Sequence, residues 1–355
     1  MRLFLFFCLL LVSTSPAFAG GNSDSFEYQK RMVPQNQYSD SSKYATKNGK
    51  QSENSSPSRS FLTKNPNYDI NVGLETGFRS SELKWNIASD LSGTTTPNIL
   101  SELKWENVYG YEVKPSISYV QKKGTLKGLR IDAEANKSIA FSGDNQDSDY
   151  LGNNRTGEFS RSNNSSDAGH SEGFSADIGY QFDFGNSRRQ NVMNFAILFG
   201  YAVQNQRFAI RDGFQTIPSD GSFADLRSSY ETEIKTPFIA AEFASSFSKS
   251  HYFKIRGQIS RGTYDGVGNW NLRQTFQHPV SFKHEADGTG FAIGAKYGWE
   301  FHPNMQLTLA SNYNYFKTDD GLDKTYFTNG NVSNIRFNEA RYTSIDYLAG
   351  FDYEF

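Results

Sequence analysis

Two aspartates in the middle of the chain have the residue type and spacing most suggestive of chemistry. Asp147 and Asp149 are separated by one residue, and carboxylates this close together can bind a cation or hold a water molecule. With Gly152 and Glu158 they follow part of the spacing of a calcium loop, but Leu151 stands where an oxygen ligand is required. The alternative without any chemistry is that they are solvated acids of a surface loop.

The other reactive residues narrow the choice of chemistry. Cys8 is the only cysteine, and it lies in an apolar N-terminal run that we expect to be absent from the mature chain. A cysteine nucleophile, a zinc site with cysteine ligands and an iron–sulfur cluster are therefore excluded. Of the five histidines, His170 and His251 have the surroundings of surface residues, and His302 lies in a short turn. We predict no metal site and no cofactor.

The N-terminal part of the chain differs in composition from the rest. Residues 1–19 are predicted to be a secretory signal peptide, with Arg2 before an apolar run and an A-x-A cleavage site that ends at Ala19. That run is too short to cross a bilayer as a helix. Residues 20–66 are rich in Ser, Asn, Gln, Lys and Pro, so they can bury little apolar surface. We predict a disordered periplasmic arm there, followed by one domain over residues 67–355.

Bulk composition favours a protein that crosses a membrane with strands. The net charge of −2 argues against nucleic acid as a partner. Mean hydropathy is −0.63, and after the signal no apolar run of about 18 residues occurs, which excludes membrane-spanning helices. Aromatic residues nevertheless make up 15% of the chain, with 30 Phe and 20 Tyr. This combination suits a barrel whose strands are apolar on one face only.

Strict alternation of apolar and polar residues begins at Tyr68 and continues to the C-terminus. In the first such segment Ile70, Val72 and Leu74 point one way, while Asp69 and Asn71 point the other; this is the period of a β-strand. Ten segments share this pattern, an even number. They cover residues 70–78, 109–119, 129–141, 174–184, 195–203, 239–243, 253–259, 291–301, 307–315 and 345–355. We predict an all-β fold, a ten-stranded antiparallel transmembrane β-barrel.

The connections between these strands alternate between short and long, as in bacterial outer-membrane barrels. The short ones have turn composition and read KKGTLKG, GNSRRQN, SKSHY and HPN. The long ones cover roughly residues 79–105, 142–172, 207–230, 262–288 and 317–340, and we predict them to be extracellular loops, with both termini in the periplasm. A soluble β-sandwich or lipocalin-like barrel would show the same alternation. Aromatic strand ends, the terminal Phe355 and the signal peptide favour the membrane.

Charged residues on the polar faces of the strands are predicted to lie inside the barrel. Charges at bilayer depth must be paired, so we expect them to form a satisfied network that plugs a narrow lumen. The residues concerned are Asp132, Glu134, Lys254, Arg256, Lys296 and Glu300.

With ten strands and this loop pattern, the sequence resembles the omptin-like outer-membrane barrels. That superfamily includes the omptin surface proteases and the Protochlamydia outer membrane protein family. The resemblance spans about residues 68–355 and rests on SELKW at 81–85 and again at 101–105, DSDY at 147–150, and the aromatic C-terminus. The twin SELKW segments flank a Gly/Thr/Pro-rich tip, so we predict that they form the two legs of a hairpin, stabilised by Trp and Glu/Lys pairing across it.

The resemblance also implies a site. In omptin proteases, an Asp-x-Asp pair in the second outer loop lies opposite an Asp-x-His pair in the fourth outer loop, and the two pairs together activate water. Asp147 and Asp149 match the first pair and are the candidate catalytic residues. At the position of the second pair stand Asn269, Trp270 and Asn271, none of which can accept a proton at neutral pH.

Three functions are compatible with these observations. The first is a non-catalytic surface barrel with long extracellular loops for binding or envelope structure. The second is an omptin-type endopeptidase with an altered site, with a base supplied by His170, His278 or His284. The third is a small-pore porin, which ten strands disfavour because side chains nearly fill so narrow a lumen. The expected partners are outer-membrane lipid, including lipopolysaccharide, and the outer-membrane assembly machinery, through Phe355; the expected location is the outer membrane of a Gram-negative bacterium.

Overall fold

The structure, a computed structural model, describes residues 65–184 and 192–355. The predicted signal peptide (1–19), residues 20–64 of the predicted arm and the predicted turn at 185–191 lie outside the described residues.

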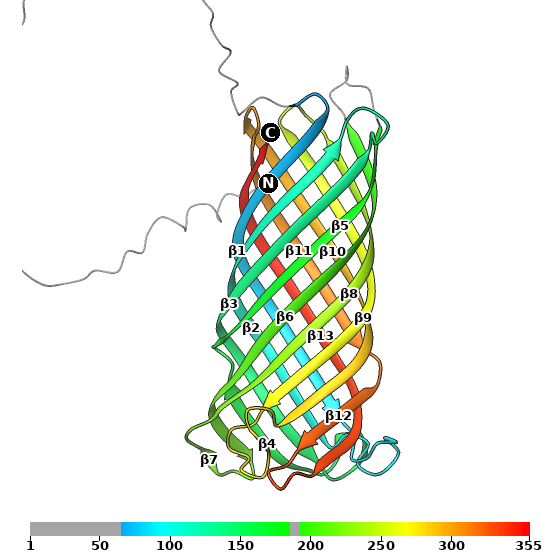
Figure 1. The fold of residues 1–355 in the computed structure, drawn as a ribbon. Coiled ribbons are helices and arrows are strands. Elements are labelled where there is room, and N and C mark those ends of the chain that lie inside the picture. Colours follow the sequence, from blue (N-terminus) through cyan, green and yellow to red (C-terminus); the bar gives the residue numbers. More distant parts are fainter. Residues whose placement is uncertain (1–64, 185–191) are drawn as a thin grey trace, which may run out of the picture. The chain divides into compact units, whose positions relative to one another are not determined.

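The described chain is a closed antiparallel ring of ten strands (Figure 1), which confirms the predicted fold class. Each strand pairs with the next, and the last pairs with the first. The ten are β1 (Tyr68–Ile87), β2 (Ser101–Gln121), β3 (Leu129–Tyr150), β5 (Gly169–Phe184), β6 (Met193–Ile217), β8 (Arg227–Ser246), β9 (His251–Asn269), β10 (Phe282–His302), β11 (Met305–Thr318) and β13 (Val332–Glu354).

Shorter elements extend the ring at one end. The strand β4 (Glu158–Ser165) continues the line of β5 between β3 and β6, and β12 (Gly321–Tyr326) continues the line of β11 between β10 and β13. The two-residue strand β7 (Gly221–Ser222) pairs with β6, and a single 3₁₀ turn covers Asn153–Arg155. No helix in the described part of the chain is both long and apolar enough to cross a membrane.

The two ends of the barrel differ. Tyr68 and Phe355 lie at the same end, together with the short turns; we call it the near end (Figure 1). The opposite end, here the far end, carries β4, β7, β12 and the hairpin tips, including residues 88–100 and 270–281.

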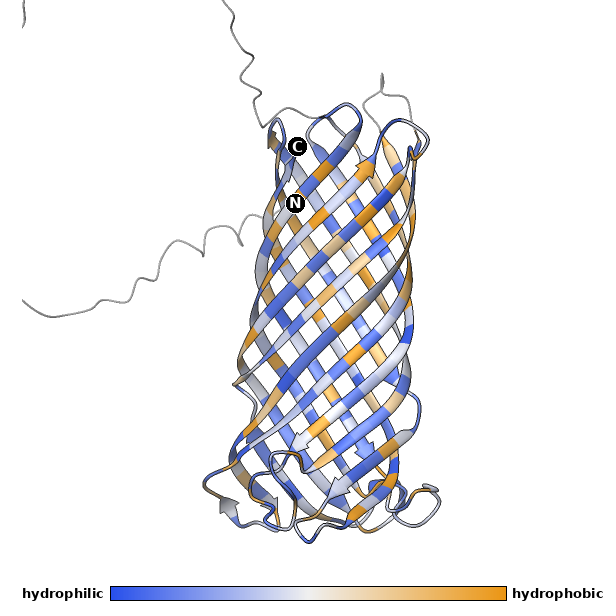
Figure 2. Ribbon diagram, in the orientation of Figure 1, coloured by the Kyte–Doolittle hydropathy of each residue, from blue (hydrophilic) through white to orange (hydrophobic). Residues whose placement is uncertain are grey.

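Between the ends, outward-facing side chains are apolar and exposed while their inward neighbours are polar and buried. Hydrophobic and hydrophilic residues accordingly alternate along the strands (Figure 2). On β1, for example, Leu74 and Phe78 are exposed, whereas Glu75 and Arg79 are buried. We call this section the belt, because an apolar outer face is what a lipid environment requires. It is defined by one exposed side chain per strand: Phe78, Tyr111, Ile131, Ile178, Phe199, Ile239, Ile255, Ile293, Leu309 and Tyr347.

Beyond the belt, towards the far end, the same alternation continues with its chemistry reversed. On β1 the inward Leu83 and Trp85 are buried, and the outward residues are Glu82 and Lys84. Apolar side chains therefore face the lumen of this far-end section, and polar ones face outwards, as in a water-soluble barrel.

The prediction that these five segments are outer loops is mostly wrong, because the strands of the barrel continue into them. Within the predicted loop 79–105, β1 runs to Ile87 and β2 starts at Ser101, so only residues 88–100 form the connection. The other four predicted loops are likewise shortened by strand extensions. Backbone hydrogen bonding between the strands continues beyond the belt because it does not depend on lipid around the barrel. In the far-end section the apolar side chains are buried inside the ring instead of against lipid.

The twin SELKW segments form the predicted hairpin, but as part of the barrel wall. Leu83 lies opposite Trp105, and Trp85 opposite Leu103. Both tryptophans point into the lumen, and the outward Lys84 lies opposite Lys104 rather than opposite an acid. The predicted Glu/Lys pairing across the hairpin is therefore not what holds it together; the buried Leu and Trp side chains are.

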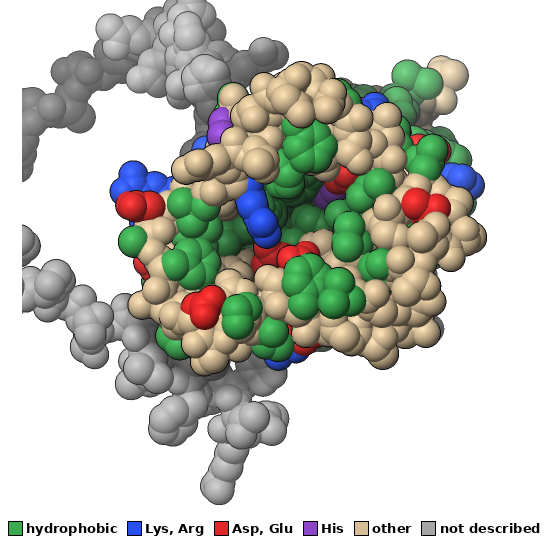
Figure 3. Space-filling model, turned by 90° about the horizontal axis from the view of Figure 1, so that it is seen from below, with side chains coloured by type: hydrophobic (Ala, Val, Ile, Leu, Met, Phe, Trp, Pro, Cys, Tyr) green, Lys and Arg blue, Asp and Glu red, His purple; other side chains and the backbone are tan. Residues whose placement is uncertain are grey.

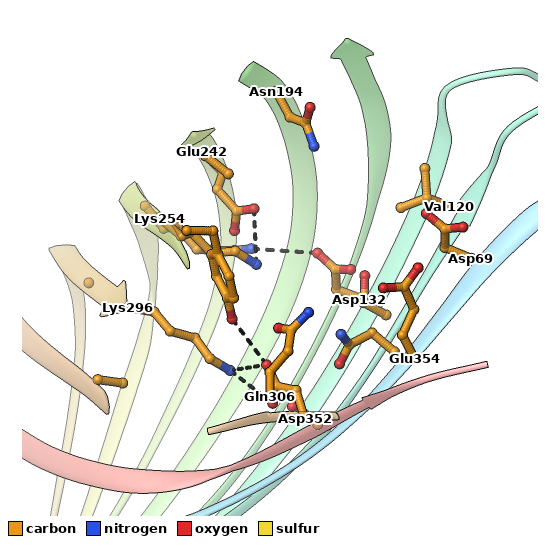
Figure 4. Close-up of a pocket in the computed structure, with 18 of the residues that line it drawn as sticks. Asp69, Val120, Asp132, Asn194, Glu242, Lys254, Lys296, Gln306, Asp352 and Glu354 are labelled. Carbon is orange, nitrogen blue, oxygen red and sulfur yellow. Dashed lines mark hydrogen bonds and ion pairs between the residues drawn. The ribbon is translucent and has the colours of Figure 1, made fainter. Parts of the chain in front are cut away.

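Inside the belt, charged side chains are paired, as predicted. Arg79 Nε lies 2.7 Å from Asp346 Oδ1 and 3.2 Å from Glu112 Oε2. Nearer the near end, Lys296 Nζ lies 2.8 Å from both Glu75 and Asp352 (Figure 4). Five of the six residues of the predicted network take part in ion pairs, namely Asp132, Glu134, Lys254, Arg256 and Lys296. For Glu300 no ion pair is found within residues 65–184 and 192–355; it lines a cavity.

Two cavities remain between these charges. The larger, about 450 Å³, occupies the near-end half of the lumen (Figure 4). The second, about 210 Å³, lies further along and shares Lys114, Glu134 and Arg256 with the first. Its lining also includes Phe316 and Tyr342, which pack against the interior of the far-end section.

Candidate functional site

The lumen of the far-end section is filled by rings. We call this set the aromatic layer, and it consists of Trp85, Trp105, Tyr230, Tyr264, Phe282, His284 and Phe337, each at most 5% exposed. Ring centroids lie 4.2 Å apart for His284 and Phe337, and 5.4 Å apart for Trp105 and Tyr230. Two glycines make room for it, since a Cβ at Gly266 or Gly268 would collide with the ring of Tyr230 or Phe282. Its residues, except His284, belong to the same buried cluster as Phe316 and Tyr342, which line the second cavity.

A hydrogen-bonded chain runs through the aromatic layer. The carboxylate of Asp323 can only accept, so the Nε2–H of His284 donates to it over 2.9 Å. His284 Nδ1 then accepts from the hydroxyl of Tyr230 at 2.7 Å, and Tyr230 accepts from Tyr264 at 2.9 Å. His284 is fully buried, which lowers its pKa, and Asp323 offsets only part of this effect. The imidazole is therefore a neutral internal brace joining β8, β9, β10 and β12.

Acidification is expected to loosen this brace. The pKa of His284 is lower in the folded chain than its usual value of about 6.5, so the unfolded chain binds the proton more tightly. The free energy of unfolding therefore falls as the pH drops below about 6.5. We expect faster amide hydrogen exchange in β10 and β12 at pH 5 than at pH 7.5, after correction for the intrinsic pH dependence of exchange. The change should disappear in His284→Gln; the same pH response in that variant would contradict the assignment.

The candidate residues Asp147 and Asp149 lie in the far-end section of β3, opposite Leu103 and Ser101 of β2. Both are half-buried. Burial raises the pKa of Asp147, and the neighbouring charge of Asp149 raises it further. Burial also raises the pKa of Asp149, with hydrogen bonds from Ser101 and Ser160 acting against it. The two carboxylates are thus like charges held close together. The far-end mouth is a hollow that contains acidic and basic side chains (Figure 3).

The groups that face this pair are not bases. The indole of Trp270 and the charge of Arg273 both favour the ionised form of Asp147, so these are the groups that act on its carboxylate. Asn271 is used structurally: its Oδ1 accepts from the backbone N–H of Arg227 and from the hydroxyl of Ser228. Trp270 therefore stands where the omptin resemblance would require a group of the Asp-x-His pair.

The predicted alternative bases do not face the acid pair. His284 is enclosed in the aromatic layer, His278 is exposed and bonded to Asn269, and His170 lies on the outer face of β5. Trp85 contacts both His284 and Trp270, at centroid distances of 4.6 and 6.4 Å. It therefore lies between the buried imidazole and the rim that carries Trp270.

The His284–Asp323 brace was missed in the sequence. The two residues are 39 positions apart and come together only because β10 pairs with β12, in a region where we predicted loops. The alternation of the sequence was the one available signal, because it places Phe282 and His284 on the same face of a strand.

The calcium interpretation finds no support among residues 65–184 and 192–355, where no group of three or more His, Cys, Asp or Glu is placed to hold a metal. Glu158, its last expected ligand, pairs instead with Arg161.

Comparison with known proteins agrees with this architecture. A sequence profile of the family described as Protochlamydia outer membrane protein matches residues 73–355. The chain belongs to this family. The family is described as an outer membrane protein and this chain forms a closed β-barrel, so the predicted location in the outer membrane is confirmed. No curated protein matches the chain.

Among solved structures, the chain is similar in fold to an omptin. The outer membrane protease OmpT from Escherichia coli superposes with a TM-score of 0.64 at 14% identity, covering 83% of this chain and 99% of OmpT. At this identity the likeness concerns the fold alone. Other matches, such as OprG from Pseudomonas aeruginosa (TM-score 0.29, 11% identity, 83% of this chain and 98% of OprG), are too distant in shape to support an argument.

Proposed function

We propose that this family member is a non-catalytic surface barrel, whose far end faces the cell exterior and serves binding or envelope structure. One observation carries the proposal: the acid pair Asp147/Asp149 faces Trp270 and Arg273 instead of an imidazole. Carboxylates alone can orient a water molecule, but hydrolysis also needs a group that takes its proton. What the mouth offers is a recess with carboxylates and an indole, which are groups suited to binding.

Orientation is part of the proposal. The short turns and Phe355 lie at the near end, which we place in the periplasm, where the terminal aromatic residue would be accessible to the assembly machinery. A cysteine placed at Ser92, in the far-end hairpin, should react with a membrane-impermeant maleimide on intact cells, whereas one at Lys249 should not. The reverse labelling would contradict the orientation.

A cleavage assay tests the absence of catalysis. Full-length protein refolded with lipopolysaccharide is expected to cleave a dibasic peptide library no faster than the Asp147→Ala/Asp149→Ala variant, since no base faces the acids. Mass spectrometry of the peptides gives the rates. Cleavage by the wild-type chain that is lost in the double variant would contradict the proposal.

The same assay addresses an altered endopeptidase, the second candidate. Its supporting observation is that the His284–Asp323 pair and the acid pair lie in the same far-end lumen. Trp85 would have to leave its position for the imidazole to reach the acids. An endopeptidase of this kind predicts cleavage that rises in Trp85→Ala and is lost in His284→Gln; a flat response in both removes it.

A further inference from the structure

Three of the four tryptophans of the chain lie together in the far-end section, with one tyrosine among them. Trp270 follows β9 at the far end and is half-buried. Its ring centroid lies 6.4 Å from that of Trp85, which lies 5.6 Å from that of Tyr230. Trp105 is stacked on Tyr230 with a centroid distance of 5.4 Å. We call these four residues the indole–phenol path. It leads from the far-end mouth, where hydrophobic side chains lie deep in the hollow (Figure 3), to a fully buried phenol.

Indoles and phenols are the side chains that lose an electron most readily where sulfur is absent. Cysteine and methionine sulfur is the usual first target of an oxidant, but Cys8, the only cysteine, lies outside the described residues. The methionines of the described ranges are Met193 and Met305, which start β6 and β11 at the near end. Among residues 65–184 and 192–355, the far-end section thus contains no sulfur, and an oxidant at the mouth meets the indole–phenol path.

The two buried indoles of the path have nowhere to release a proton. The Nε1–H groups of Trp85 and Trp105 are buried and find no hydrogen-bond partner in the described part of the chain. An indole that loses an electron there keeps its proton, remains a strong oxidant and takes an electron from a neighbouring ring. The indole of Trp270 differs, because it is hydrogen-bonded to Asp147, and a negative charge beside it favours the loss of its electron. We therefore expect oxidation to start at Trp270 and to move inwards.

The phenol of Tyr230 has the base that the buried indoles lack. Its hydroxyl donates to Nδ1 of His284 at 2.7 Å, and Nε2–H of His284 donates to Asp323 at 2.9 Å. Burial lowers the pKa of His284 and raises the pKa of Tyr230 well above its ordinary value, so the imidazole is neutral and the phenol protonated before oxidation. A phenol that has lost an electron is strongly acidic. Its proton can then cross the 2.7 Å hydrogen bond, and the carboxylate of Asp323 stabilises the imidazolium that forms.

We propose that Tyr230 is a redox centre that collects oxidising equivalents from the far-end mouth and holds them as a neutral tyrosyl radical. An oxygen-centred one-electron oxidant takes an electron from Trp270 and is itself reduced. An electron from Trp85 refills Trp270, and an electron from Tyr230 refills Trp85. The phenolic O–H bond of Tyr230 breaks, its proton forms an N–H bond at Nδ1 of His284, and both tryptophans are restored. The inference uses the rings behind the mouth, so it holds whether or not the mouth binds a ligand.

A second tyrosine bonded to a histidine provides the matched control. The hydroxyl of Tyr297 lies 2.7 Å from Nδ1 of His251 at the near end. Both side chains are only partly buried, and they lie on β9 and β10 at the opposite end of the barrel from Tyr230. A radical at Tyr297 would be open to solvent, so we expect it to decay quickly.

The test uses the full-length chain with Cys8→Ser, refolded with lipopolysaccharide, and a flash-activated ruthenium tris-bipyridine complex with persulfate as the one-electron oxidant. Electron paramagnetic resonance after the flash should show a persistent tyrosyl radical in this parent chain, with a signal that narrows when its tyrosines are ring-deuterated. Y230F should lose the signal. H284Q should lose it as well, because an amide cannot take up the proton. W85F should slow its appearance, because the ring of phenylalanine is far harder to oxidise.

The control Y297F removes the other phenol that is bonded to a histidine and should keep the signal of the parent chain. The signal should also appear more slowly in heavy water, because the proton leaves Tyr230 together with the electron. An undiminished signal in Y230F or H284Q would overturn the proposal, as would its loss in Y297F, an unchanged rate in heavy water or an indole radical as the lasting product. Retained heat-modifiable migration on gels shows that each variant is folded. Ring deuteration and heavy water need no variant, so they test the proposal on the parent chain itself.

Discussion

Replacing Arg79 with methionine is expected to lower the free energy of unfolding by about 3–5 kcal/mol, because it leaves two carboxylates buried without their cation. The guanidinium contacts Asp346 at 2.7 Å and Glu112 at 3.2 Å, and it donates to Ser171 at 2.9 Å. All three charged side chains are at most 6% exposed. Urea unfolding of the protein in phospholipid vesicles measures the change.

Two comparisons make this prediction specific. Lys235→Met removes an exposed cation paired with Glu233 and should change the free energy of unfolding by less than about 1 kcal/mol. Combining Arg79→Met with Glu112→Gln and Asp346→Asn should recover much of the loss, since no unpaired charge then remains. A single Arg79 variant as stable as the wild type would show that the lumen charges are not coupled as described.

Truncating the aromatic layer is expected to convert a silent barrel into a conducting one. The two lumen cavities share lining residues, and the second reaches Phe316 and Tyr342, which belong to the same buried cluster as the layer. We therefore expect the rings to be the barrier between the cavities and the mouth. We expect the triple variant Trp85→Ala, Trp105→Ala, Tyr230→Ala to give discrete conductance steps in a planar bilayer. The wild type should give none.

Trp299→Ala is the matched control, because this tryptophan is 44% exposed on the outside of the belt. This variant loses an indole side chain outside the lumen, so the barrel should remain without conductance steps. Steps in the wild type, or silence in the triple variant, would contradict the view that the layer closes the lumen.

The belt could be predicted from the sequence because lipid imposes a visible rule. Every outward position from Val72 to Phe78 must be compatible with hydrocarbon or its border, while Glu75 and Arg79 must face the lumen. Ten repeats of that pattern were enough to predict the number of strands, the closed ring and that Tyr68 and Phe355 lie at the same end of the barrel.

The far-end section could not be predicted because its alternation has the opposite meaning. Leu83 and Trp85 look like lipid-facing residues in sequence, yet they face inwards. Which face is inside depends on unbroken counting from the belt along β1, and on β2 an irregularity between residues 106 and 109 interrupts that count.

The candidate site shows the same limit. Asp147 and Asp149 were predicted to lie in the second outer loop, but they lie on strand β3, and their role stays a prediction. The partners that decide their chemistry, Trp270 and Arg273, come from a hairpin more than a hundred residues later in the chain. Only the register of the whole ring brings these segments together.

Cysteine accessibility along residues 82–85 tests most directly the claim that the barrel wall continues beyond the belt with reversed polarity. In a chain with Cys8→Ser, single cysteines at Glu82, Leu83, Lys84 and Trp85 would be treated with a water-soluble maleimide after refolding. We predict fast labelling at 82 and 84 and protection at 83 and 85. Equal labelling at all four positions, as expected for an extracellular loop, would contradict it.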